Sequence, residues 1–198
     1  MSLAIVTSVD DFFYTEIEKI SKRHGLQLSP LVLRYLSGLL AKFSTASELK
    51  LTHPTEHKDM TPTEFWLEIQ KLPYSQQLQA LQFLGDYSLF TTGFFSEYTK
   101  GSLLDRDYFQ AIGGKAYYRA GEIKENIAAE KSINVYFSLA ESFRRFSEIF
   151  SEIYDQTLLH SSDGAIKLFE RWQQNGSDHL TRMLFENGFH IGKKPTAE

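Results

Sequence analysis

Hydrophobic side chains recur every three or four residues along most of the 198-residue chain. This period predicts amphipathic helices, whereas the apolar–polar alternation of strands is hard to find. Capping residues mark where helices should begin: Ser8, Ser29–Pro30, Thr61–Pro62 and Ser177 each precede such a run. The pattern therefore predicts about eight helices and an all-α fold, a single-domain helical bundle.

The longest predicted helix covers about residues 132–160 and carries a broad apolar stripe. Charged residues, among them Arg145, Glu148 and Glu152, should lie on the opposite face. A stripe this broad favours a central helix with several neighbours, and a self-association seam is the alternative. The stripe consists of Tyr136, Leu139, Phe143, Phe146, Phe150 and Ile153.

The length of the chain fits one domain, which we expect to span residues 1–190. Residues 44–60 lack a clear helical period, and we interpret them as a long surface loop. Residues 191–198 are expected to form a flexible C-terminal tail.

The predicted surface loop contains a motif that resembles a metal site. His53, Glu56 and His57 match H-x-x-E-H, a pattern found in zinc metalloproteases. That chemistry needs both histidines on one helical face, but Pro54 and the new helix at Thr61 leave barely one turn. We therefore expect no metal here and interpret the motif as a chance match.

The helix expected near residues 74–96 contains a stripe of small side chains. Small residues let another backbone approach closely, so this stripe predicts a close helix crossing. Asp86 should lie with Gln79 and Gln82 on a narrow polar edge, either exposed to solvent or in a simple salt bridge. The small residues are Gly85, Ser88, Thr92 and Ser96.

The helix expected near residues 105–128 also contains glycines, among them Gly114 and Gly121. Each interior glycine costs a helix about 1 kcal/mol relative to alanine, so something should compensate. Close packing of the two helices is the first interpretation, and a pocket between them for a small apolar or aromatic ligand is the alternative. The candidate pocket residues are Asp86, Tyr87, Phe94, Arg106, Tyr117, Tyr118 and Arg119.

Composition narrows the possible classes of function. A net charge of -4 with scattered basic residues argues against nucleic acid as a partner. The absence of cysteine excludes disulfides and thiolate metal sites and fits the cytoplasm. No apolar run approaches the roughly 20 residues of a membrane helix, so we expect no membrane partner.

The sequence contains no phosphate-binding, dinucleotide-binding or hydrolase motif, so no cofactor is expected. The first functional hypothesis is a non-enzymatic module for protein–protein contact, acting as a homodimer. The second is a small-molecule-binding helical bundle that uses the pocket between the two glycine-bearing helices. A hydrolase is the third, because an acid–base site can be assembled from residues distant in sequence.

Overall fold

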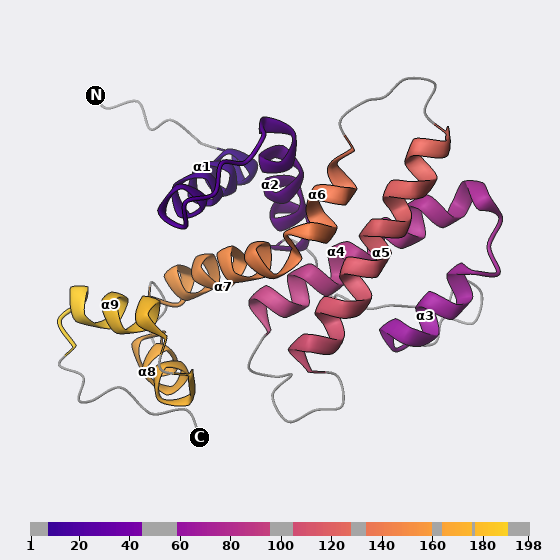
Figure 1. Cartoon of the computed structure of the whole chain (residues 1–198). Coiled ribbons are helices and arrows are strands. Elements are labelled where there is room, and N and C mark those ends of the chain that lie inside the picture. Colours follow the sequence, from indigo (N-terminus) through magenta and orange to yellow (C-terminus); the bar gives the residue numbers. More distant parts are fainter. Residues whose placement is uncertain are drawn as a thin grey trace.

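Nine α-helices and no β-strand are found in the part of the chain that the computed structural model describes (Figure 1). The all-α class is therefore confirmed. The described residues are 8–44, 59–95, 105–127, 134–159, 164–175 and 177–189. The helices are α1 (Val9–Arg23), α2 (Pro30–Ser44), α3 (Pro62–Ile69), α4 (Tyr74–Phe94), α5 (Arg106–Ile127), α6 (Val135–Glu141), α7 (Phe143–Leu159), α8 (Gly164–Asn175) and α9 (Asp178–Glu186).

Local capping explains where several helices begin. The Ser8 hydroxyl accepts a hydrogen bond from the Asp11 N–H at 3.1 Å, and Ser177 accepts one from the Leu180 N–H at 3.2 Å. Thr61 and Glu64 form a reciprocal capping box at the start of α3. These bonds satisfy N–H groups that have no partner within the helix, so short sequence signals set these boundaries.

The crossing of α4 and α5 is the most extensive helix–helix contact in the described structure. A Cβ atom placed on Gly85 would lie 2.6 Å from ring carbons of Tyr117, and one on Gly113 would lie 2.6 Å from Ser88 and Phe143. Gly114 is different, since its nearest such neighbour is the Ala140 carbonyl oxygen at 3.9 Å. Gly85 and Gly113 therefore lie where the two helices approach most closely.

The other small residues have separate neighbours. Gly121 faces the ring of Phe137, whose nearest carbon lies 2.7 Å from the position of a Cβ atom. The Ser88 and Thr92 hydroxyls donate hydrogen bonds to carbonyls one turn earlier in α4, both at 2.7 Å. Ser96 lies outside the described residues.

The helix predicted over residues 132–160 is interrupted at Ser142, so its continuity was predicted wrongly. Ser142 has φ −105° and ψ 16°, outside the helical region, and α6 and α7 run in different directions (Figure 1). The break lets α6 pack along α5 while α7 packs against α1 and α4. Packing against different neighbours therefore overrides an uninterrupted helical sequence pattern.

Buried apolar side chains form two clusters in the described residues. The larger one draws on α1 to α7 and includes Tyr117 and Phe150. The smaller one joins the end of α7 to α8 and α9 through Leu158, Trp172 and Leu184. None of the helices in these ranges is both long and apolar enough to cross a membrane. Most of the predicted surface loop, residues 45–58, and the predicted tail lie outside the described residues.

The glycine at the α4–α5 crossing gives a direct test of the packing. Gly85→Ala should lower the free energy of unfolding by about 1–3 kcal/mol, because the added methyl group displaces the Tyr117 ring. Gly38→Ala in α2 is the matched control, because a Cβ there meets nothing within 4 Å. It should stabilise the protein by up to about 1 kcal/mol. Urea unfolding measures both, and equal effects of the two substitutions would contradict the packing.

Candidate functional site

Asp86 in α4 is buried in the bundle, with 4% of its surface exposed. Its Oδ1 atom accepts hydrogen bonds from the hydroxyls of Tyr35 at 2.6 Å and Tyr117 at 2.8 Å. Tyr35 lies in α2 and Tyr117 in α5, so three helices meet at this carboxyl group. The expectation of a solvent-exposed or simply salt-bridged Asp86 was wrong, because α2 covers this edge of α4.

Further polar and aromatic groups surround the carboxyl group. The Oε1 atom of Gln82, one turn before Asp86 in α4, accepts a hydrogen bond from the Tyr136 hydroxyl at 2.9 Å. The rings of Tyr35, Tyr117 and Tyr136 pack on one another with centroids 6.0–6.4 Å apart. Tyr35 and Tyr117 thus hold the Asp86 carboxyl group, and the Tyr136 ring packs against both of them.

Burial raises the pKa of Asp86 to about 6, while the hydrogen bonds from Tyr35 and Tyr117, the charge of Lys42 and the nearby Gln82 amide oppose the rise. Burial and the nearby Asp86 charge raise the pKa values of Tyr35 and Tyr117 above the usual 10. Both tyrosines therefore stay protonated and donate. Asp86 is a carboxyl group that gains or loses its proton near neutral pH.

Asp86 lines a depression between α2 and α4 with a volume of about 470 Å³ and a lining of mixed polarity. Lys42 comes from α2, with its ammonium group 5.4 Å and 5.7 Å from the ring centroids of Phe43 and Phe83. Three glutamines one helical turn apart supply amide groups from α4. The full lining is Lys42, Leu72, Gln76, Gln79, Ala80, Gln82, Phe83 and Asp86. We call this depression the Asp86 pocket.

Of the residues predicted for a pocket between α4 and α5, the structure brings together Asp86 and Tyr117. Tyr117 is fully buried, and its ring takes the space beside Gly85. The Asp86 pocket lies instead toward α2, and a mixture of amide, charged and apolar side chains lines it, unlike the aromatic lining that we expected.

The other residues that we predicted to line this pocket contact different neighbours or solvent. Tyr87 is half-buried near Phe109, and the Phe94 ring stacks on Phe90 at 4.5 Å. Tyr118 is 55% exposed. In separate contacts, Arg106 donates to the Ser147 hydroxyl and Arg119 pairs with Glu122.

Metal binding finds no support in the described part of the chain. No group of three or more histidine, aspartate or glutamate side chains there is arranged to hold a metal ion. The motif residues His53, Glu56 and His57 lie outside the described residues.

Sequence reasoning missed Tyr35 and Lys42, the two charged or hydrogen-bonding residues that α2 contributes to the site. The sequence did predict that Gln79 and Gln82 share an edge of α4 with Asp86, because their spacing follows the helical period. Tyr35 precedes Asp86 by 51 residues, and no local pattern connects the two.

Comparisons with known proteins give no identity to this site. The chain matches no protein-family model, and searches of curated proteins and of solved structures found no significant match. The site's chemistry must therefore be judged from its own residues.

The raised pKa of Asp86 predicts an unusual dependence of stability on pH. Between about pH 4 and 6 the folded chain holds a proton that the unfolded chain, with an ordinary pKa of 3.8, has lost. Stability contributed by this group therefore falls as pH rises through this window. Asp86→Asn should flatten the profile and raise the free energy of unfolding at pH 7 by up to about 3 kcal/mol.

Urea unfolding at several pH values between 4 and 7 measures this effect. Asp107→Asn is the control, since Asp107 is an exposed aspartate in the first turn of α5. A destabilised Asp86→Asn variant that keeps the wild-type pH profile would show that Asp86 does not titrate as described.

Proposed function

We propose that the protein is a non-enzymatic binding protein that takes a small polar molecule in the Asp86 pocket. The observation that carries the proposal is the buried Asp86 carboxyl group, hydrogen-bonded by two tyrosines at the edge of a depression that glutamine and lysine side chains also line. Burying an ionisable group costs free energy of folding, and groups with strongly perturbed pKa values concentrate at functional sites.

The pocket lining supports a ligand rich in hydrogen-bonding groups. Glutamine amides both donate and accept, the Asp86 carboxylate accepts, and the Lys42 ammonium donates. Leu72 and Phe83 add apolar contact for the ligand's carbon atoms. A volume of about 470 Å³ falls within the range of small-molecule sites, roughly 300–1,000 Å³.

Binding without catalysis is the simpler proposal for this set of residues. The two tyrosines that contact Asp86 have raised pKa values and act as fixed hydrogen-bond donors. The lack of cysteine anywhere in the sequence supports a reducing compartment, and we place this binding function in the cytoplasm.

A binding screen with matched variants tests the proposal. Ligand-observed NMR against free amino acids, polyamines and nucleobases should yield a binder, and native mass spectrometry should detect any molecule that copurifies. Lys42→Met and Asp86→Asn should weaken binding of that molecule at least tenfold, about 1.4 kcal/mol each.

Lys115→Met is the matched control for these variants. Lys115 also lies over an aromatic ring, 5.0 Å from the Trp66 centroid, but it does not line the pocket. It should leave the affinity unchanged. If neither Lys42→Met nor Asp86→Asn changes the affinity for the molecule that is found, that molecule binds outside the Asp86 pocket.

Self-association, the first hypothesis from the sequence, is a second proposal. It is supported by large apolar side chains exposed on two helices that pack together, Ile166 of α8 at 65% and Phe185 of α9 at 68%. Sedimentation velocity should show a dimer at high micromolar concentration. A monomer throughout that range would contradict it.

A further inference from the structure

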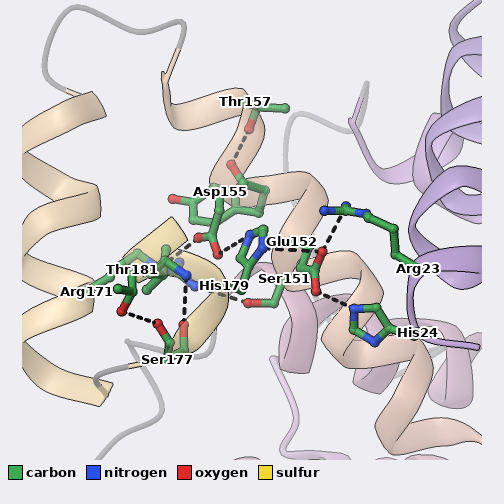
Figure 2. Close-up of polar contacts among 12 residues, drawn as sticks. Arg23, His24, Ser151, Glu152, Asp155, Thr157, Arg171, Ser177, His179 and Thr181 are labelled. Atoms are coloured by element: carbon green, nitrogen blue, oxygen red, sulfur yellow. Dashed lines mark hydrogen bonds and ion pairs between the residues drawn. The ribbon is translucent and has the colours of Figure 1, made fainter. Parts of the chain in front are cut away.

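Charged side chains from four helices meet beside the C-terminal half of α7 (Figure 2). Glu152 and Asp155 of α7 lie at the centre, with 7% and 3% of their surfaces exposed. The apolar stripe placed Glu152 on the polar outer face, which is wrong, because α1 and α9 cover that part of α7. We call these residues and their partners the α7 charge cluster.

Glu152 joins the end of α1 to α7. Its Oε2 atom lies 3.1 Å from Arg23 Nη2, and its Oε1 atom lies 2.5 Å from His24 Nε2. Arg23 and His24 come from the last turn and the C-cap of α1. One buried carboxylate thus contacts two basic side chains from the same helix end.

Asp155 joins α8 to α7. Its Oδ1 atom lies 3.0 Å from Nε of Arg171, which is 2% exposed. The same guanidinium group donates a hydrogen bond to the Ser151 hydroxyl at 3.1 Å and lies over the Tyr154 ring. Removing one partner of such a buried pair leaves an uncompensated charge, so Arg171 fixes the position of α8.

His179 of α9 lies between the two carboxylates (Figure 2). Its Nδ1 atom is 3.5 Å from Glu152 Oε2, and its Nε2 atom is 3.8 Å from Asp155 Oδ2. Neither ring nitrogen makes a well-formed hydrogen bond within the described structure. The ring therefore contacts both acids without the short bonds that would hold an added proton.

The carboxylates of the cluster are each paired with a guanidinium group in the described structure. Two guanidinium groups, Arg23 and Arg171, face two carboxylates, Glu152 and Asp155. Glu152 and Asp155 are the two carboxylates that the His179 ring contacts among the described residues, and each of them already faces a guanidinium group. A proton on His179 therefore adds a positive charge to two existing ion pairs. Burial lowers the pKa of His179 below 6.5, with Arg23, Arg182 and His24 contributing and Glu152 opposing.

We propose that the α7 charge cluster is an acid-sensitive latch that holds α8 and α9 on α7 and opens when His179 takes up a proton. The α7 charge cluster shares no residue with the Asp86 pocket, so this proposal does not depend on the proposed binding function. It acts on the smaller apolar cluster, where Leu158 of α7 packs with side chains of α8 and α9.

The direction of the effect follows from the sign of the pKa shift. A released His179 has the ordinary pKa of 6.5 and a docked one has a lower value. The released state therefore binds more protons, and acid favours release. The contribution to docking is complete above pH 6.5 and is lost as pH falls toward the docked pKa.

Tryptophan fluorescence can follow the release of α8. The chain contains two tryptophans, and Trp66→Phe leaves Trp172 of α8 as the reporter. Trp172 is 4% exposed and donates a hydrogen bond to the Thr181 hydroxyl of α9 at 2.9 Å. Its emission should shift to the red as pH falls from 7.5 to 5 and return when neutral pH is restored.

Two substitutions in this background identify the titrating group. His179→Gln removes the proton site and should abolish the red shift, whereas His24→Gln should retain it. A shift that persists without His179, or one that vanishes only without His24, would overturn the proposal. Acidification that leaves the wild-type reporter buried would also overturn it.

If α8 and α9 do not dock in the His179→Gln variant, a measurement on the unsubstituted protein still tests the proposal. NMR titration of the histidine ring resonances should give His179 a pKa below 6.5. The protection factors of amides in residues 164–186, which correct for the intrinsic pH dependence of hydrogen exchange, should fall as the pH is lowered through the same range, while those of α4 and α5 stay high. A His179 pKa at or above 6.5 would overturn the latch whatever the variants do.

Discussion

At Gly85, the ring of Tyr117 takes the space that a side chain would fill. The next residue along α4 is Asp86, and the Tyr117 hydroxyl reaches its carboxyl oxygen at 2.8 Å. The same close approach that lets α4 and α5 cross thus places a hydrogen-bond donor inside the bundle. Tyr35 of α2 completes the arrangement from the other side. One glycine therefore links the packing of three helices to the chemistry of one acid.

The burial of Asp86 beside a depression does not stabilise the fold, so it calls for another reason. A bundle built only for stability would bury an apolar side chain at residue 86, because an ionised carboxyl group loses its hydration there. Two tyrosines and Gln82 reduce that penalty without removing it, since the pKa of Asp86 stays raised. Such a compromise favours the proposed binding role of Asp86 over a purely structural one.

Local signals in the sequence predicted most of the helices. The features that the sequence did not predict depend on contacts between residues far apart in the chain. The caps at Ser8, Thr61 and Ser177 depend on residues within one turn, so they can be recognised directly. The small-residue pattern also indicated the close crossing of α4 and α5. By contrast, the break at Ser142 follows from the different neighbours of α6 and α7, which a helical wheel does not contain.

The burial of individual charged residues could not be predicted from the sequence for the same reason. A wheel places Asp86 and Glu152 on polar faces, and in each case another helix covers that face. The partners of Asp86 and Glu152, Tyr35 and Arg23, come from positions 51 and 129 residues away. Burial of a charged residue is thus a property of the assembled bundle. The sequence shows which residues could titrate, and the packing decides which of them have a perturbed pKa.

The two polar clusters respond to acid in opposite directions. Asp86 has a raised pKa, so lowering the pH through about 6 removes a buried charge and strengthens the packing of α2, α4 and α5. His179 has a lowered pKa, so the same change adds a charge beside α7 and weakens the docking of α8 and α9. Mild acid would then loosen one end of the molecule while its larger core becomes firmer. Separate apolar clusters allow this division, because release of the smaller one leaves the contacts within the larger one in place.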